Sequence, residues 1–462
     1  MKILPPLDSG FVSAALWTRD YRRLVALDPG ARPFALALVR ADGSVYRHEE
    51  RLLSADHPQA ARSRLHVERL LKFLLWQKGA ARVLVAGAPE IAAYLDREYA
   101  ADGARAFDRE FMGRRVFGEG FAIIPVALDA LPAARSVGLA AGRHLGGCRI
   151  GFDLGGSDRK AAAVIDGKVV WSEEIAWDPY FQADPSYHIE GVHDSLRRAA
   201  AHLPRVDAIG GSAAGVYVNN EVRAASLFRG VSPEDFEARV RRMFFTLRER
   251  WGGVPFEVVN DGEVTALAAS MSLGVNSVLG ISMGTSMAGG YVTPEGTITQ
   301  WLNELAFAPI DYRADGPRDE WSGDRGCGVQ YFSQQGVARL AGLAGLEFPD
   351  GLGLPERLIE VQQALARGDA RARAVYETIG VCFGHALAHY ADFYAMEHVL
   401  ILGRVTSGAG GEIILERARA VLRAEFPELA GRISLHTPDE SNKRHGQAIA
   451  AASLPALPST TS

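Results

Sequence analysis

The sequence predicts an α/β protein with more than one domain. The chain has 462 residues, more than a single hydrophobic core usually organises. From residue 24 to about residue 425, short apolar runs of strand length alternate with longer segments of helical periodicity. Three of the apolar runs end in glycine-rich turns, near Gly155, Gly284 and Gly403. Because α/β proteins bind ligands at the ends of strands, these turns are the first candidates for a functional site.

The composition is that of an ordinary folded protein. Hydrophobic residues make up 48% of the chain and charged residues 23%, which is typical of soluble globular domains and argues against disorder. The net charge is −5, so nothing indicates a surface for nucleic-acid phosphates. An arginine-rich stretch at 239–250 has helical spacing and is interpreted as the solvated face of a helix.

Cysteine usage and the absence of targeting patterns indicate the compartment. Cys148, Cys327 and Cys382 are far apart and lack the C-x-x-C spacing of a zinc site. The first residues show no signal-peptide pattern, and no stretch reaches the apolar length of a membrane span. We therefore expect a soluble, cytoplasmic protein with reduced thiols that binds neither membranes nor nucleic acid.

The stretch from Gly151 to Lys168 is the first candidate site. It contains an apolar strand, an Asp-x-Gly-Gly-Ser turn and a second strand that ends at Asp166-Gly167. Glycines have no Cβ, so they let backbone amides approach a phosphate closely. Asp153, at the mouth of the turn, is a candidate to hold a hydrated Mg²⁺. Taken alone, the same pattern also fits an ordinary hairpin with a glycine bulge.

Residues 1–146 are expected to form a separate α/β domain. Residues 1–20 have no clear pattern, and the apolar run 24–27 predicts a strand. The layout of 24–46 parallels the strand–turn–strand unit at 150–168, which fits either a degenerate copy of that unit, as in half of an actin-like fold, or a chance similarity. The remaining pattern predicts strands at 34–39, 83–87 and 121–126 and helices at 61–79 and 88–101.

Beyond residue 146, strands lead repeatedly into polar or glycine-rich turns. The strand 256–260 ends in Asn260-Asp261, and the strand that starts at 277 opens a second glycine-rich hairpin with hydroxyls at Thr285 and Ser286. Further strands are expected at 171–175, 207–211 and 399–403, and helices at 188–203, 232–252, 264–273, 355–395 and 412–425.

The order of these motifs resembles the actin-like, hexokinase-like ATPase superfamily, and within it the ROK family of bacterial sugar kinases and regulators. The resemblance covers 147–455. It implies a two-lobed, actin-like (ribonuclease H-like) ATPase fold with an additional N-terminal α/β domain. The implied lobes are 147–275 and 276–455, followed by a tail at 456–462. It also implies a kinase that uses ATP and Mg²⁺ to phosphorylate a hydroxyl of a sugar or amino sugar, with a homodimer as the family-level expectation.

The resemblance assigns a role to each matched residue. Asp261 corresponds to the catalytic base, and Asn260 and Glu304 correspond to sugar ligands. Ser212, which follows the strand 207–211, is a further candidate for substrate binding, and Asp153 remains the candidate for Mg²⁺. The residues implied in binding ATP are Asp153, Gly155, Gly156, Ser157, Lys160, Gly284, Thr285, Ser286, Gly289, Gly403, Ser407 and Gly408.

Several departures from the family pattern affect mainly the sugar half. Phe307 stands where the family has a histidine that contacts both the sugar and a structural zinc. The cysteine-rich zinc segment is reduced to Gly326-Cys327-Gly328, so no zinc is expected. Asp158 occupies a position where Lys or Asn is common, and Gly262-Glu263 replaces Ala-Asn.

The chemistry implied for Asp261 has a structural alternative. A sugar hydroxyl is a poor nucleophile at neutral pH, and a carboxylate within hydrogen-bond reach can orient it and accept its proton. Asn260-Asp261-Gly262 also fits a turn and N-cap for the following helix. Its position between two glycine-rich hairpins favours the catalytic role.

Two other functions stay open. The protein could be a sugar or nucleotide sensor without chemistry, or an ATPase driven by a protein partner through the first domain. The strands expected at 24–46 argue against the helix-turn-helix of the DNA-binding members of the family.

Four other residues attract attention. His385 and His389 have the i, i+4 spacing of metal ligands, but no third ligand is near in sequence, which favours ordinary, partly buried histidines. Trp301 and Trp321 flank Glu304 and either stack on a sugar or pack in the core.

Overall fold

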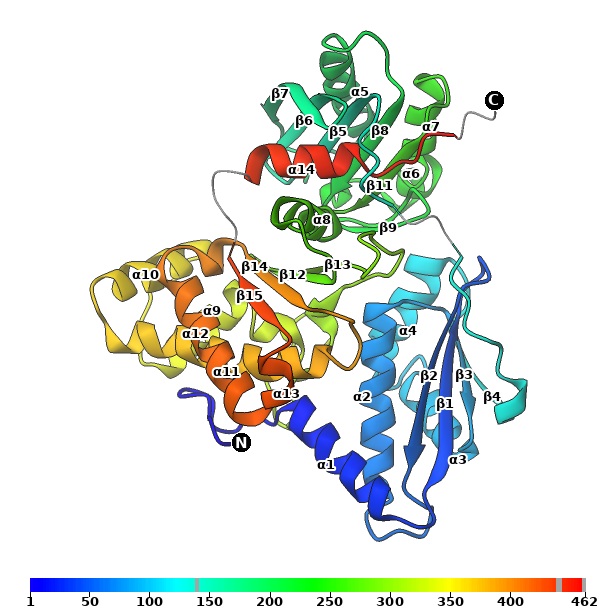
Figure 1. The fold of residues 1–462 in the computed structure, drawn as a ribbon, viewed down its shortest axis with the longest axis vertical. Coiled ribbons are helices and arrows are strands. Elements are labelled where there is room, and N and C mark those ends of the chain that lie inside the picture. The colour runs from blue at the N-terminus through cyan, green and yellow to red at the C-terminus, as the bar shows by residue number, and fades with distance from the viewer. Residues whose placement is uncertain (138–140, 438–442, 459–462) are drawn as a thin grey trace.

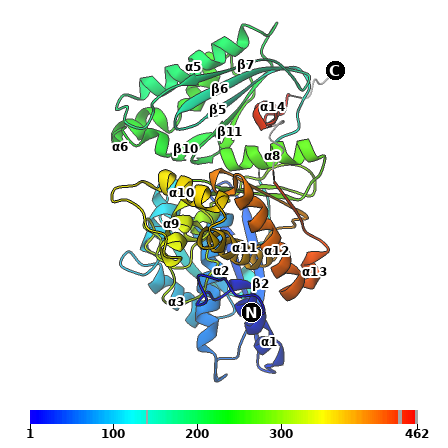
Figure 2. The same ribbon diagram turned by 90° about the vertical axis from the view of Figure 1, so that its left-hand side faces the viewer.

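The computed structural model describes residues 1–137, 141–437 and 443–458. It consists of a first domain (blue to cyan in Figure 1), a first lobe (blue-green to green) and a second lobe (green to orange). The side view in Figure 2 shows the first lobe above the other two bodies. The three bodies contain sheets of four, five and four strands, and a two-stranded ribbon accompanies the first lobe. No helix within the described ranges is both long and apolar enough to cross a membrane.

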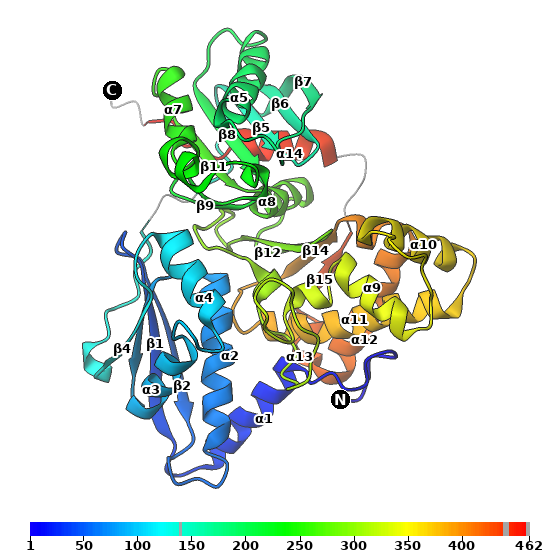
Figure 3. The same ribbon diagram turned by 180° about the vertical axis from the view of Figure 1, so that it is seen from behind.

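The first domain is a four-stranded sheet packed against helix α2. The strand order is β2-β1-β3-β4. Helix α2 lies between this sheet and the second lobe (Figure 3), and every side chain from His66 to Gln77 is buried. The expected helices and later strands of the domain are confirmed. Its elements are α1 (Ala14–Leu27), β1 (Arg32–Val39), β2 (Val45–Leu52), α2 (Ala61–Gln77), β3 (Arg82–Ala86), α3 (Pro89–Glu98), α4 (Ala106–Glu110), a π-helical segment (Phe111–Phe117) and β4 (Ala122–Val126).

The prediction of a strand at 24–27 was wrong, because these residues end helix α1. The hydroxyl of Ser13 caps the helix by accepting the N–H of Leu16 at 3.3 Å. The buried Thr18, Tyr21 and Val25 are spaced by three and four residues, so they lie on one face of the helix. The apolar run was too short to reveal this period. The preceding residues are also ordered, and Phe11 belongs to the core of the second lobe.

The first domain is not a copy of a lobe. Strand β1 runs antiparallel to both β2 and β3, whereas the first strand of each lobe runs parallel to a later strand of that lobe. One reversed pair changes the topology, and residues 24–27, which the comparison with 150–168 requires to be a strand, belong to a helix. Since α1 is followed by a hairpin and not by a second helix, residues 14–52 do not form a helix-turn-helix.

The first lobe is a mixed sheet with the order β11-β8-β5-β6-β7. Helices α5 and α7 pack on it around the buried Phe152 and Phe244. The strands and the helices expected at 188–203 and 264–273 are confirmed, but the single helix expected at 232–252 is divided into α6, a π-helical segment (Phe236–Val240) and α7. The elements are β5 (Cys148–Leu154), β6 (Asp158–Ile165), β7 (Lys168–Ala176), α5 (Pro185–Ala200), β8 (Ala208–Ala213), β9 (Val216–Val218), β10 (Glu221–Ala224), α6 (Pro233–Asp235), α7 (Met243–Arg250), β11 (Phe256–Asn260) and α8 (Asp261–Leu273).

The second lobe has the sheet order β13-β12-β14-β15 and a helical layer. Its central helix, α11, is buried along most of its length and packs against α12. The elements are β12 (Val278–Met283), β13 (Met287–Val292), α9 (Gln334–Leu343), α10 (Leu354–Ala366), α11 (Ala370–Tyr390), β14 (His398–Leu402), α12 (Ala409–Glu425), α13 (Pro427–Ala430) and β15 (Ser434–His436).

Helix α14 (Lys443–Ala452) returns to the first lobe, where it lies on β5 and β8 (red in Figure 1). The contact is so close that a Cβ on Gly151 would overlap the carbonyl oxygen of Ala448, and one on Gly210 that of Ala451. The second lobe, expected at 276–455, therefore ends before α14.

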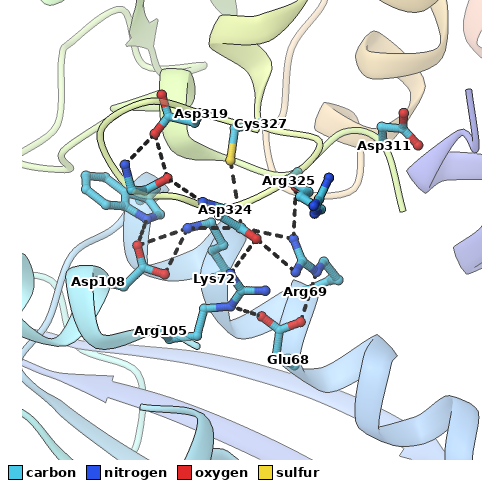
Figure 4. A network of polar contacts seen from close by, with 12 residues as sticks. Glu68, Arg69, Lys72, Arg105, Asp108, Asp311, Asp319, Asp324, Arg325 and Cys327 are labelled. Atoms are coloured by element: carbon cyan, nitrogen blue, oxygen red, sulfur yellow. Dashed lines mark hydrogen bonds and ion pairs between the residues drawn. The ribbon is translucent and has the colours of Figure 1, made fainter. Parts of the chain in front are cut away.

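A buried network of ion pairs joins α2 to the second lobe (Figure 4). The ammonium of Lys72 lies 2.8 Å from Asp108 and 3.3 Å from Asp324, and Asp324 also pairs with Arg69 at 3.0 Å and with Arg105. Burial alone would raise the pKa of Asp324, but the three cations outweigh it and hold that pKa well below its usual range. The network therefore stays ionised although it is inaccessible to water.

We expect Asp324→Asn to weaken the attachment of the first domain, because Lys72 and two arginines would lose a buried counter-charge. Removing one partner of a buried ion pair costs roughly 3–5 kcal/mol, so the midpoint of urea unfolding should fall. The control is Asp315→Asn, whose side chain is 89% exposed in the same loop and whose midpoint should not change. An unchanged midpoint for Asp324→Asn would contradict this role of the network.

Candidate functional site

The carboxyl ends of three neighbouring strands bring the first candidates together. Strands β5, β8 and β11 run parallel, with Asp153 opposite Ser212 and Ala213 opposite Asn260. The hydroxyl of Ser212 donates to the carboxylate of Asp153. Asp153, Ser212 and Asn260 therefore share one edge of the sheet, where α/β proteins place their ligands.

The first glycine-rich turn is held in shape from both sides. The N–H of Gly155 donates to the carbonyl of Asp158 at 3.0 Å, and the carbonyl of Gly155 accepts the indole N–H of Trp177 at 2.8 Å. Ser157 is exposed, and Gly155 and Gly156 are partly exposed. The turn is thus held by two hydrogen bonds, and it stays partly exposed although Tyr180 lies against Gly156.

Lys160, next to this turn, is shared between two acids. Its ammonium lies 3.0 Å from Asp158 and 4.0 Å from Asp153. Burial would lower the pKa of Lys160, but the hydrogen bond to Asp158 and the charges of both acids raise it. The hydroxyl of Ser157 also donates to Asp158 at 2.9 Å. Asp158 is therefore the closer of the two acids that compensate the charge of Lys160.

The second glycine-rich turn and the turn after β14 lie at one edge of the second sheet. Strands β12 and β14 pair in parallel, and Thr285 and Ser286 are exposed between β12 and β13. Gly403 has a φ of 101°, and a Cβ there would lie 2.5 Å from the carbonyl oxygen of Met283. Only glycine fits between the two turns, so Gly284 and Gly403 are close together. Ser407 and Gly408 follow directly before the N-terminus of α12.

Helix α8 begins directly on the backbone of β13. A Cβ on Gly262 would lie 2.5 Å from the carbonyl oxygen of Gly289, and a Cβ on Gly290 would overlap the carbonyl oxygen of Gly262. Gly289 is therefore buried inside β13, where it packs against α8. The structure does not place it in the exposed turn with Thr285 and Ser286.

Asn260 and Asp261 stand where β11 meets α8. The side-chain oxygen of Asn260 caps the helix by accepting the N–H of Gly262 at 2.7 Å, and its amide donates to the carbonyl of Gly215 at 2.7 Å. Burial, and then the charge of Asp153, raise the pKa of Asp261 to about 6. Asn260 is thus a structural cap, and Asp261 is a carboxylate that can exchange a proton near neutral pH.

Two further groups share the environment of Asp261. Burial, followed by the charge of Asp261, raises the pKa of Glu304 to about 7. Tyr217, which the sequence analysis missed, has a pKa raised far above its usual range by burial and by the charges of Asp261 and Asp153. Tyr217 lies in a short, weakly patterned strand, and no local signal identifies it. Asp153, Asp261 and Glu304 come from separate segments. The charge of Asp153 acts on Asp261, and the charge of Asp261 acts on Glu304.

Glu263 and Asn303 form a deeper cluster that the sequence also did not reveal. Burial raises the pKa of Glu263 to about 8, so its carboxyl group is largely protonated at neutral pH. This group accepts the N–H of Tyr291 at 3.1 Å and the side-chain amide of Asn303. The other side-chain atom of Asn303 accepts the hydroxyl of Tyr394 at 2.7 Å. Glu263 therefore connects α8 to the segment that carries Glu304.

The two tryptophans near Glu304 differ. Trp301 stacks on Tyr291 with ring centroids 5.5 Å apart, whereas Trp321 is 70% exposed. Trp301 also lines a pocket of about 130 Å³, together with Tyr217, Asn260 and Glu263. Trp301 therefore contributes both to packing and to the wall of this pocket.

The paired histidines are buried among aromatic rings. His389 lies 5.0 Å from Phe73 between ring centroids, and burial lowers the pKa of His385 to about 4 and that of His389 to about 3. Both rings are neutral and more deeply buried than expected. Within the described ranges, no group of three or more His, Cys, Asp or Glu side chains is placed to hold a metal ion.

The interaction between Asp153 and Asp261 can be measured directly. Asp153→Asn should lower the pKa of Asp261 from about 6, because it removes a nearby negative charge. The change should be partial, since burial is the larger cause and remains. The measurement is a carbon-13 NMR titration of labelled aspartates, and Asp166→Asn, at the other end of the same hairpin, is the control. Equal values in both variants would mean that the two carboxylates do not interact.

Comparisons with known family models and with curated proteins give no match. Solved structures do match. The ROK hexokinase from Thermus thermophilus has a TM-score of 0.52 and 20% identity, and the match covers 66% of this chain and 98% of that chain. A putative sugar kinase from Cytophaga hutchinsonii has a TM-score of 0.50 and 14% identity, with 66% and 98% covered. A ROK family transcriptional regulator, a homologue of the E. coli MLC protein, has a TM-score of 0.49 and 20% identity, with 67% and 78% covered.

These matches concern the fold. About two thirds of this chain corresponds to nearly the whole of the hexokinase, which is the share that the two lobes make up. The predicted two-lobed α/β fold is confirmed: over about two thirds of its length, the chain has the fold of the Thermus thermophilus ROK hexokinase and of the Cytophaga hutchinsonii putative sugar kinase.

Proposed function

We infer that the protein is a kinase that transfers a phosphoryl group from ATP to a hydroxyl of a sugar or amino sugar. The observation that carries this proposal is the environment of Asp261. Its carboxylate, with a pKa of about 6, stands at a strand end beside Asp153 and Glu304, in a fold that the Thermus thermophilus hexokinase shares. A base with a pKa slightly below neutral is ionised at pH 7 yet able to accept a proton.

In the half of the site that binds the sugar, the side chains would orient the sugar hydroxyl and accept its proton. The sugar hydroxyl would donate a hydrogen bond to Asp261, which accepts its proton as the new P–O bond forms. Glu304 and Ser212 supply further polar groups around the same space. The amide of Asn260 is already bound to Gly215, so its contribution is to hold the start of α8 in place.

In the half of the site that binds the nucleotide, main-chain amides would bind the phosphates of ATP. The Gly155–Ser157 and Gly284–Ser286 turns present exposed or partly exposed residues at the ends of strands, and Gly403, Ser407 and Gly408 would lie near the adenosine. Burial raises the pKa of Asp153 although Ser212 and Lys160 act to lower it, and a hydrated Mg²⁺ would be a favourable partner for this carboxylate. When bound, Mg²⁺ would neutralise charge on the phosphates.

Asp261→Asn should abolish sugar-dependent ADP release and leave ATP binding intact, because the amide keeps the shape but accepts no proton. Loss of a general base typically costs on the order of 10²–10⁴-fold in rate. The assay is ADP release with Mg-ATP over a panel of sugars and amino sugars, and Asp235→Asn, in an exposed helix start of the same lobe, is the control. Undiminished turnover of Asp261→Asn would refute the assignment.

Asp158→Asn should lower the KM for ATP, because Lys160 would then lose one of its two acidic partners and attract the phosphates more strongly. Partly exposed charge pairs contribute about 0.2–1 kcal/mol, so we expect a decrease of roughly 1.4- to fivefold. Glu190→Gln, which removes a surface carboxylate from α5 of the same lobe, should leave the KM unchanged. A higher KM in Asp158→Asn would mean that this acid supports nucleotide binding.

The pairing of Asp158 with Lys160 also favours a second candidate, a protein that binds sugar or nucleotide without turnover. The same assay, together with a measurement of ATP binding, separates the possibilities. Sugar-dependent ADP release supports the kinase, sugar-independent release supports an ATPase driven by a partner, and absence of ATP binding supports a sugar sensor.

A further inference from the structure

The last turn of helix α2 is bonded to the segment that carries Glu304. The main-chain N–H of Asn303 donates to the carbonyl of Gln77 at 3.0 Å, and that of Glu304 donates to the carbonyl of Trp76 at 3.0 Å. The last carbonyls of a helix have no partner within the helix. These bonds therefore give a partner to two carbonyls at the end of α2 and to the N–H groups of Asn303 and Glu304. The backbone of Glu304 is therefore attached to the first domain.

Aromatic rings strengthen the same contact. The indole of Trp76 stacks on the ring of Phe307 with centroids 4.3 Å apart, and Phe107 lies 5.7 Å from Phe307. Trp76 has no exposed surface, whereas Phe307 is partly buried and packs against the cores of both the first domain and the second lobe. Because Phe307 follows Glu304 by three residues, this stack limits how far Glu304 can shift.

The position of Trp76 is itself fixed by the ion network. Its indole N–H donates to Asp108 at 2.9 Å, and the same carboxylate accepts the ammonium of Lys72, one turn earlier in α2. Residues four apart lie on the same face of a helix, so Lys72 and Trp76 face the second lobe together. Asp324 of the second lobe completes the connection through Lys72.

A buried arginine makes a second connection on the other side of the helix end. Arg40 donates to the carbonyl of Gly79 at 2.8 Å and to that of Gln300 at 2.8 Å, and it also bonds the carbonyl of Lys78. Gln300 precedes Glu304 by four residues. The segment is thus attached to the first domain at three successive places, Gln300, Asn303-Glu304 and Phe307.

The first domain is packed into the enzyme as part of its core. Val216 and Val218 of the first lobe and Leu302 of the second lobe belong to the same buried cluster as the sheet and helix of the first domain. Domains that move independently usually meet through smaller and more polar interfaces. A shared core indicates that this domain and the segment of Glu304 keep a fixed geometry.

We propose that the first domain is a positioning element of the sugar site, in which the end of α2, with Trp76 as its central side chain, fixes the backbone of Glu304. This inference rests on the proposed kinase function. Trp76 is a positioning residue, because it acts through the segment 303–307 and has no exposed surface for a substrate. A displacement of about 1 Å in a site can cost on the order of 10²-fold in rate.

The test compares sugar and nucleotide kinetics in variants of the full-length protein. Trp76→Ala should raise the KM for the sugar or lower kcat, reducing kcat/KM for the sugar by roughly 10- to 100-fold, while the KM for ATP changes less than twofold. Trp76→Phe keeps a ring on Phe307 and should recover most of the loss. The matched control is Trp171→Ala, a partly buried tryptophan stacked on His202 at the far side of the first lobe, which should change neither KM.

A double variant tests whether Trp76 acts through Phe307. The combination of Trp76→Ala with Phe307→Ala should be no worse than the more severe single variant, because both remove one stack. If Trp76→Ala does not fold, the same comparison of single and double variants is made with Trp76→Leu and Phe307→Leu.

Each outcome gives a decision. An unchanged KM and kcat for the sugar, or parallel losses for sugar and ATP, would overturn the positioning role. Sugar-independent ADP release or no release by the wild-type protein would instead overturn the proposed function, and this result is visible before any variant is made.

Discussion

The first turn of helix α8 touches the backbone of β13 at Gly262, with no side chain between them at that point, and the candidate site depends on this contact. Glycines at 262 and 290 make the approach possible. The contact places Asp261 at the junction of the lobes, and it brings Glu263 within reach of the strand and of Asn303. Because α8 is a stiff element seated on main-chain atoms, these acids keep a fixed spacing. A single added methyl group here would shift both of them.

The crowding of acids at this junction is the electrostatic signature of the site. Burial is the main reason why the pKa values of Asp261, Glu304 and Glu263 rise to about 6, 7 and 8. Bringing carboxylates together away from water costs free energy, and proteins retain such clusters mostly where a cation or proton transfer offsets the cost. Asp153 adds a fourth acid whose pKa is also raised. The arrangement suits a ligand that brings positive charge and hydroxyl groups at the same time.

The sequence could predict those features that depend on a few neighbouring residues. The Asp153 hairpin, the Asn260-Asp261 strand end and the Gly403 turn are encoded within a few residues, so their strands and helices are found where the pattern places them. Helix α1 was missed because its apolar face repeats only over its full length. The bonds from Trp76 and Gln77 to residues 303 and 304 join segments more than 220 residues apart. The sequence of an apolar helix does not indicate which distant segment the helix will contact. Gly289 was misplaced for a related reason, since a glycine needed for close packing looks the same as one needed for a phosphate.

The return of α14 to the first lobe has a consequence for biosynthesis. Strands β5 and β8 carry Gly151 and Gly210 where this helix lies, so no side chain of the sheet separates the two at these points of closest contact. Arg149, buried in the same lobe, donates to the carbonyls of Ala452 and Pro455. As the ribosome synthesises the chain, this face of the first lobe must therefore wait for almost the entire second lobe before α14 can cover it. The other face, which packs against α5 and α7, is complete much earlier.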